Sequence, residues 1–177
     1  MLLFLVNEGT LFACLLASYF YLGVEHRVWP PTGVEKPSLR LPLIMTAALL
    51  SSSGVLMIAE SGFERARPGR FRAGVIGTVM LGVVFLSLQL IEYRDKLPRI
   101  HPSDSAYASL FYTITGLHGA HVAFGLLFLL WALAREMAGT TRPPRSMAIK
   151  NASLYWHFVD GVWLVILTSL YLSPHWW

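Results

Sequence analysis

The sequence predicts an all-α fold: an integral membrane bundle of five transmembrane helices. Of its 177 residues, 55% are hydrophobic and only 14% are charged, whereas a soluble domain carries about 25% charged residues. The mean hydropathy is +0.54. The apolar residues also fall in long continuous blocks separated by short polar segments. Together these three observations indicate a membrane protein.

Five apolar blocks are long enough to be membrane-spanning helices, because a bilayer core about 30 Å thick needs about 20 residues per helix. They are residues 1–23, 42–59, 73–93, 105–134 and 153–172. The first block lacks a basic leader and carries Glu8, so we expect a retained helix and not a cleaved signal peptide. The fourth is long enough to tilt or to project beyond the bilayer. Residues 1–177 are therefore expected to form a single five-helix domain.

The loops between the blocks predict the orientation of the chain in the membrane. Basic residues gather in cytoplasmic loops, and the densest basic run, "RARPGRFR", occupies residues 65–72. The loops after the second and fourth blocks hold eight basic residues, against six in the loops after the first and third. We therefore expect a cytoplasmic N-terminus and a C-terminus outside. The five-helix length and the composition rich in Arg, Ala and Gly favour a bacterial cytoplasmic membrane. The basic residues behind the net charge of +4 lie in these short loops, where they set topology, and no nucleic-acid partner is expected.

Several polar side chains fall inside the apolar blocks. An ionisable group at the bilayer centre costs a few kcal/mol, so each such residue is a functional hypothesis. These residues are Glu8, Gln89, Glu92, His118, His121, His157 and Asp160. The second block contributes "SSSG", residues 51–54, a stretch typical of close packing and hydrogen bonding between helices.

The spacing of these polar residues predicts shared helix faces. "HGAH" at 118–121 and "HFVD" at 157–160 each place two polar side chains three positions apart, on one face of a helix. With the orientation above, Glu8, His121 and His157 could share one layer of the bundle. Three glycines frame the first pair and allow close approach of a neighbouring helix: Gly116, Gly119 and Gly125.

Three roles remain open for the histidines. They could hydrogen-bond between helices as structural residues, carry protons because histidine titrates near neutrality, or hold a metal or haem, with His157 opposite His118 or His121. No second matched histidine pair exists, and the carboxylates are too few for a di-iron centre. The only cysteine, Cys14, excludes an internal disulfide, a cysteine-held iron–sulfur cluster and a CxxC pair. We therefore predict no metal and no cofactor in this chain.

Aromatic and basic residues near the ends of the blocks suggest contacts with the membrane interface. Residues expected in an aromatic belt are Tyr19, Tyr21, Trp131, Trp156, Trp176 and Trp177. Trp163 is deeper in its block and is expected to pack in the core. Arg135 ends the fourth block at headgroup level, where it could contact a lipid phosphate or simply anchor the positive side of the helix.

Several motifs resemble a known family. "SDSAYASLFYTITGLHGAHVAFGLL" and "YWHFVDGVWLVILTSLYL" resemble the last two helices of subunit III of the haem–copper respiratory oxidases. "NEGTLFACLLASYFYL" is similar to the helix that carries that family's membrane-embedded carboxylate, and "VWPPTG" resembles the loop after it. "LPLIMTAALLSSSG" and "QLIEY" fall in the expected order. The resemblance covers nearly the whole chain and matches a short form with five helices in place of the common seven.

The resemblance implies an accessory subunit of a terminal oxidase, most simply of the cytochrome c type. Such a subunit has no redox centre, packs beside the catalytic subunit I, stabilises it during oxygen reduction and proton pumping, and in some members supports proton uptake. Haem and copper would then belong to partner subunits. Subunit II, other oxidase subunits, bound phospholipids and a respiratory supercomplex are further expected partners.

The resemblance also assigns positions to the polar residues. Glu8 matches the family's membrane-embedded carboxylate, and Glu92 matches the acid before the loop that contains "SD". The two C-terminal motifs contain the remaining matched residues: His118, His121, His157 and Asp160. None of them is catalytic in the bond-making sense, so the chain is expected to be a non-catalytic subunit of a proton-translocating oxidoreductase.

Two other functions stay open at this point. A subunit III homologue could serve a quinol oxidase or a nitric-oxide reductase system, which the electron donor of the purified complex would reveal. A small independent haem protein or transporter would instead show a Soret band in the isolated chain, or transport without partners.

Overall fold

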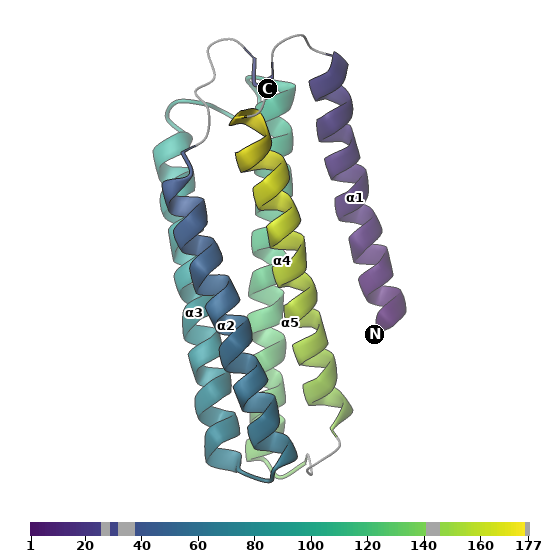
Figure 1. The fold of residues 1–177 in the computed structure, drawn as a ribbon, viewed down its shortest axis with the longest axis vertical. Coiled ribbons are helices and arrows are strands. Elements are labelled where there is room, and N and C mark those ends of the chain that lie inside the picture. Colours follow the sequence, from purple (N-terminus) through teal and green to yellow (C-terminus); the bar gives the residue numbers. More distant parts are fainter. Residues whose placement is uncertain (26–28, 32–37, 141–145, 176–177) are drawn as a thin grey trace.

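The structure is a bundle of five long α-helices, as the sequence predicts (Figure 1). The computed structural model describes residues 1–25, 29–31, 38–140 and 146–175. The helices in this part of the chain are α1 (Leu2–Glu25), α2 (Arg40–Glu64), α3 (Pro68–Lys96), α4 (Ala106–Met137) and α5 (Met147–Ile166). A π-helical segment, η1 (Leu167–Leu172), and a 3-10 turn, η2 (Ser173–His175), continue α5. All five spans are long and apolar enough to cross a bilayer.

The helices extend beyond the apolar blocks into charged sequence. Only residues 65–67 separate α2 from α3, and α3 begins with Pro68, a residue favoured at the first helical position. α5 begins at Met147, where the Ser146 hydroxyl accepts a hydrogen bond from the Ile149 amide. Hydropathy marks only the part of a helix that suits lipid, whereas backbone hydrogen bonding continues until a cap or turn ends it. Polar helix ends therefore project past the spans.

The five helices are not equally buried. In Figure 1, α2, α3, α4 and α5 lie together, whereas α1 stands at one edge of the bundle. Only 17% of the apolar window of α1 is buried, against 56% in the last span. The end of α2, the start of α3, the end of α4 and the start of α5 gather at the lower end of Figure 1.

The core is rich in aromatic side chains, and two of them contradict the expected aromatic belt. Trp156 is completely buried and donates a hydrogen bond to the Ser52 hydroxyl at 3.0 Å, and Tyr19 is 1% exposed. The belt assignment was wrong for these two residues because position near a helix end does not determine which face a side chain occupies. Trp163 packs in the core as predicted and donates to the Thr46 hydroxyl at 2.9 Å.

Trp131 and Tyr21 are exposed, at 46% and 70%, as belt residues would be. Some residues used in the sequence predictions lie outside the described part of the chain: Arg27, Lys36, Arg142, Arg145, Trp176 and Trp177.

Glycines permit the closest helix contacts. A Cβ placed on Gly74 would lie 2.6 Å from the Ala59 Cβ, a distance that real side chains do not tolerate. At Gly119 it would lie 2.7 Å from Gln89 Oε1, and at Gly125 it would lie 3.0 Å from Trp156 Cε3. The prediction that glycines around the histidines allow close helix approach is therefore confirmed at these two positions.

Candidate functional site

The first polar contact of interest joins α1 to α4. His121 Nε2 lies 2.9 Å from Glu8 Oε2, and the two side chains are 14% and 16% exposed. The Phe12 ring packs edge-on against the His121 ring at 5.2 Å. His121 Nδ1 lies 2.7 Å from the Leu117 carbonyl oxygen, one turn earlier in α4. The histidine is therefore oriented by its own helix and directed at the carboxyl group of another.

These contacts determine where the protons of the pair lie. A backbone carbonyl only accepts hydrogen bonds, so Nδ1 of His121 must carry a hydrogen. One further proton lies between Nε2 and Glu8, either on the imidazole beside a carboxylate or on the carboxylic acid beside a neutral imidazole. In both arrangements the pair holds one exchangeable proton at the partly exposed boundary of the bundle.

A second group connects α2 to α5. The Ser53 hydroxyl lies 2.9 Å from His157 Nδ1 and also donates a hydrogen bond to Asp160 Oδ2. Since a hydroxyl donates only one hydrogen, it must accept from His157. The result is a directed chain from His157 through Ser53 to Asp160. The other carboxyl oxygen of Asp160, Oδ1, is buried and has no hydrogen-bond partner among the described residues.

A third group lies near the C-terminal end of α3, where Glu92 is buried. Lys96 Nζ contacts Glu92 Oε1 at 2.7 Å, and the Tyr171 hydroxyl donates to Oε2 at 3.0 Å. The Lys96 ammonium also lies 4.3 Å from the centre of the Phe111 ring. The ion pair itself lies within α3, and the Tyr171 bond and the Phe111 ring contact tie it to η1 and α4.

Gln89 and its neighbours form a further tie between α3 and α4. The Gln89 amide donates to the Thr115 carbonyl at 2.7 Å, and the Tyr93 hydroxyl lies 2.6 Å from the Thr115 hydroxyl. The polar residues near the C-terminal end of α3 thus bond to protein groups inside the bundle.

His118 differs from the other polar residues because it has no polar contact. It is completely buried, stacks on Trp163 at 5.2 Å and meets the Phe85 ring edge-on at 5.7 Å. Neither of its ring nitrogens has a hydrogen-bond partner within the described chain. His118 and His121 both border Phe12, as their spacing predicts, yet one enters the core and the other meets Glu8.

The layer that was expected to hold Glu8, His121 and His157 is therefore only partly present. Glu8 and His121 are in contact, whereas the hydrogen-bond partner of His157 is Ser53 on α2. Among the described residues, no group of three or more histidine, cysteine, aspartate or glutamate side chains could hold a metal ion.

Arg135 lies at the exposed end of α4. Its guanidinium carbon is 5.2 Å from the centre of the Trp131 ring, and Nε donates to the Thr140 hydroxyl at 3.4 Å. The neighbouring Glu136 is engaged with Arg72, whose Nε donates to Glu136 Oε2 at 2.9 Å. Arg135 thus keeps a surface position at the lower end of the bundle.

Sequence reasoning missed several participants in these groups, and Ser53, Lys96 and Tyr171 illustrate why. Ser53 was only one member of a serine-rich stretch, and Lys96 was counted as a loop charge. The spacing of Glu92 and Lys96, four positions apart, could have indicated their ion pair. Tyr171 comes from a distant part of the chain, and no local pattern connects it to Glu92.

The chain matches a known protein family. A family model described as "Cytochrome c oxidase subunit III" matches residues 1–177. Proteins named cytochrome c oxidase subunit 3 are similar along the chain. The one from Locusta migratoria is 35% identical, with 100% of this chain and 67% of the relative covered. For Pyricularia grisea the values are 37%, 96% and 65%, and for Thermostichus vulcanus 34%, 97% and 85%. The chain thus spans about two thirds of the first two relatives.

Proposed function

This chain belongs to the cytochrome c oxidase subunit III family, and on that premise we propose that it packs beside the catalytic subunit of a terminal oxidase. In this role it stabilises that subunit during oxygen reduction and has no redox centre of its own. Haem and copper belong to the partner subunits. Subunit II, further oxidase subunits and phospholipids complete its surroundings, and the complex can join a respiratory supercomplex.

The contact between Glu8 and His121 carries the functional part of this proposal. It holds one exchangeable proton, and both side chains are partly exposed at the edge of the bundle, whereas His118 is completely enclosed. A proton that can be reached from outside the bundle can be exchanged with a neighbouring subunit. We therefore assign the pair two linked tasks: fastening α1 to α4 and supporting proton supply to the catalytic subunit.

The other polar groups act as ties between helices. The bond from Tyr171 to Glu92 and the chain from His157 through Ser53 to Asp160 each connect elements distant in sequence. In a bilayer, such hydrogen bonds fix the rotation and register of helices. They give the subunit a rigid face against which a partner can pack.

We further propose that the lower end of the bundle in Figure 1 faces the cytoplasm of a bacterial cell. Exposed Arg65, Arg67 and Arg70 gather there, in agreement with the distribution of positive charge in membrane proteins. The N-terminus is then cytoplasmic and the C-terminus outside. Arg135, at the same end, is placed to contact a lipid phosphate.

Affinity capture of the full chain in mild detergent tests this function, with absorption spectra and metal analysis of the captured material. Haem and copper should accompany the chain and should be lost when it is separated from the larger subunits. The captured complex should oxidise reduced cytochrome c. A Soret band that remains with the isolated chain would contradict the proposal. A complex that oxidises quinol but not cytochrome c would contradict only the choice of cytochrome c as the electron donor.

A further inference from the structure

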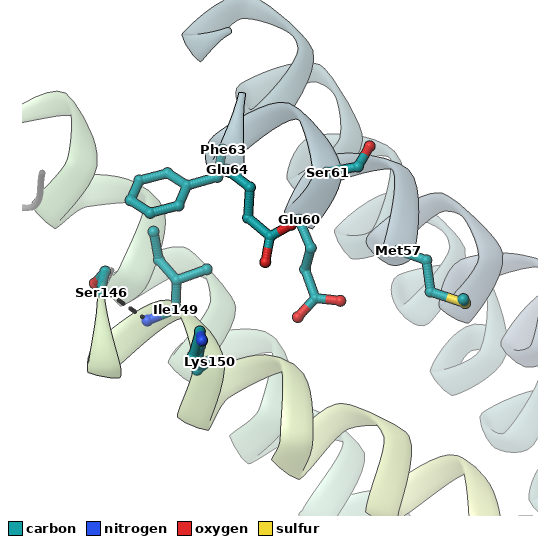
Figure 2. A pocket seen from close by; sticks show the side chains of 8 residues that line it. All are labelled: Met57, Glu60, Ser61, Phe63, Glu64, Ser146, Ile149 and Lys150. Carbon is teal, nitrogen blue, oxygen red and sulfur yellow. Dashed lines mark hydrogen bonds between the residues drawn. The ribbon is translucent and has the colours of Figure 1, made fainter. Parts of the chain in front are cut away.

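A charged cavity lies at the lower end of the bundle, between the end of α2 and the start of α5 (Figure 2). It has a volume of about 220 Å³. Glu60 and Glu64 line it from α2, and Lys150 lines it from α5. The remaining wall consists of the apolar side chains of Met57, Phe63 and Ile149 and of two serines, Ser61 and Ser146. None of these charges takes part in the polar groups described above.

The charged side chains of this cavity are not paired with each other. Figure 2 shows the carboxyl groups of Glu60 and Glu64 on the side of α2 that faces α5. Within the described chain, neither carboxylate forms an ion pair or hydrogen bond with Lys150 or with any other residue. By contrast, Glu92 and Glu136 are each engaged by a cation, Lys96 and Arg72. Among the described residues that line it, the cavity therefore presents the carboxyl groups of Glu60 and Glu64 opposite the Lys150 ammonium, with no bond between them.

The cavity lies at the depth of lipid headgroups. α2 has 25 residues, a length of roughly 37 Å, which exceeds a hydrocarbon core of about 30 Å. The last turn of α2 and the first turn of α5 therefore lie at the membrane surface, beside the basic turn at 65–67. Met57, one turn deeper and 62% exposed, extends the apolar wall toward the acyl chains. A ligand with a charged head and an apolar body suits this arrangement.

We propose that this cavity binds the headgroup of a phospholipid that carries a primary ammonium, a phosphatidylethanolamine. The ammonium lies between Glu60 and Glu64, where its hydrogens can form charge-assisted bonds, and the phosphate lies at Lys150. Among the described lining residues, an anionic lipid would meet two carboxylates and one cation. A choline headgroup has no N–H to donate. The inference requires only that the helices span a bilayer, so it does not depend on the oxidase assignment.

Native mass spectrometry of the full chain in mild detergent tests the site, with ethanolamine, choline and glycerol phospholipids that share the same acyl chains. The wild-type chain should bind the ethanolamine lipid about tenfold more tightly than the choline lipid, a ratio that one charge-assisted hydrogen bond supplies. In E60Q/E64Q the ratio should fall toward one, because the affinity for the ethanolamine lipid is lost selectively. K150Q should weaken the binding of both lipids, because both have a phosphate.

Matched control variants carry the same charge changes at the opposite end of the bundle. Glu25, Asp95 and Arg94 are exposed residues at the ends of α1 and α3, so E25Q/D95N and R94Q should keep the wild-type ratio. If the double variant does not fold, the single variants Glu60→Gln and Glu64→Gln test each carboxylate separately. Equal affinity of the wild-type chain for both lipids would overturn the proposal, as would tightest binding of the glycerol lipid. So would a ratio that persists in E60Q/E64Q and in both single glutamate variants. Displacement of the lipid by Mg²⁺ that depends on both carboxylates would also overturn it.

Discussion

Glu8 and His121 meet at 2.9 Å across the contact between α1 and α4, with the other histidine nitrogen held by the Leu117 carbonyl. α1 is the least buried of the five spans, so this polar contact contributes a large share of its attachment to the bundle. The same contact holds the exchangeable proton on which the functional proposal depends. The two roles can be separated. A structural role requires only that residue 8 forms a hydrogen bond to His121, whereas a proton-linked role requires that it can release a proton.

Glu8→Ala should loosen α1. Polar contacts between membrane helices contribute about 0.6 kcal/mol and up to about 1.7 kcal/mol, so hydrogen exchange of α1 amides should accelerate about three- to twenty-fold. Mass spectrometry of the purified complex measures this exchange. Thr10→Ala is the control, because the Thr10 hydroxyl bonds only to the Val6 carbonyl of its own helix. Unchanged exchange, assembly, turnover lifetime and pumping stoichiometry in Glu8→Ala would remove any role for the pair.

Glu8→Gln tests the proton separately from the tie. The glutamine amide can still donate a hydrogen bond to His121 Nε2, so α1 exchange should stay close to that of the wild type, but the amide cannot release a proton. Proton uptake by the reconstituted complex should therefore slow while assembly remains normal. Full proton uptake in this variant would restrict the pair to a structural role.

His118→Phe should be tolerated. The phenylalanine ring can take the place of the imidazole beside Trp163 and Phe85, and it removes two buried nitrogens that have no partner among the described residues. Unfolding in SDS should show a free energy unchanged or raised by about 1 kcal/mol, because an unsatisfied buried polar group is costly. His121→Phe is the comparison, since it loses contacts with Glu8 and the Leu117 carbonyl. A fall in the free energy of unfolding by more than about 1 kcal/mol on His118→Phe would show that the imidazole makes a stabilising contact in this pocket.

The sequence predicted the five spans because hydropathy and the thickness of a bilayer are local constraints on each segment. It also located most intramembrane polar residues, since a charged or polar group in an apolar block is visible without a fold. The partners of those residues depend on how each helix rotates about its axis in the bundle. His157 therefore meets Ser53, and Trp156 enters the core, although their positions along the chain suggested other surroundings.

The charged cavity illustrates the same limit. Glu60 lies just beyond the predicted end of the second block, and Lys150 lies before the predicted start of the fifth. Both were assigned to loops by hydropathy, whereas the structure places them on helices that continue past the apolar core. Only the pairing of α2 with α5 brings the two charges to one cavity.

Ser53→Ala should destabilise the bundle. The substitution removes the bonds to His157 and Asp160 and leaves a carboxyl group that is 5% exposed without a partner. The free energy of unfolding in SDS should fall by about 1–3 kcal/mol. Ser61→Ala on the same helix is the control, because its hydroxyl bonds only to the Ile58 carbonyl. Equal stability of the two variants would show that the tie between α2 and α5 has no energetic weight.

Gly74→Ala should separate α2 from α3. The new Cβ would lie 2.6 Å from the Ala59 Cβ and 3.0 Å from its Cα, so the helices must move apart, at a cost of about 1–3 kcal/mol. Gly54→Ala on α2 is the control, since nothing lies within 4 Å of its Cβ position. That control should be neutral or stabilising, because alanine favours a helix over glycine by about 1 kcal/mol. Equal unfolding free energies in SDS would contradict the close packing.

Lys96→Met should be the most damaging single change at the C-terminal end of α3. Glu92 has a side chain that is 3% exposed, and its carboxyl group accepts bonds from Lys96 and Tyr171. Removal of one member of a buried ion pair costs about 3–5 kcal/mol, because the other charge is left uncompensated. Unfolding in SDS, followed by tryptophan fluorescence, measures the loss.

A double-mutant cycle separates the ion pair from the packing of the lysine stem. In E92Q/K96M the neutral amide can still accept the Tyr171 hydroxyl bond, so the double variant should be more stable than Lys96→Met alone, with a coupling energy of about 1–3 kcal/mol. Arg94→Met, at an exposed position on the same helix, should change stability by less than about 0.5 kcal/mol. If the two substitutions were additive, Lys96 would act through its contacts with the rings of Phe111 and Tyr171. The ion pair would then contribute nothing to holding α3 against η1.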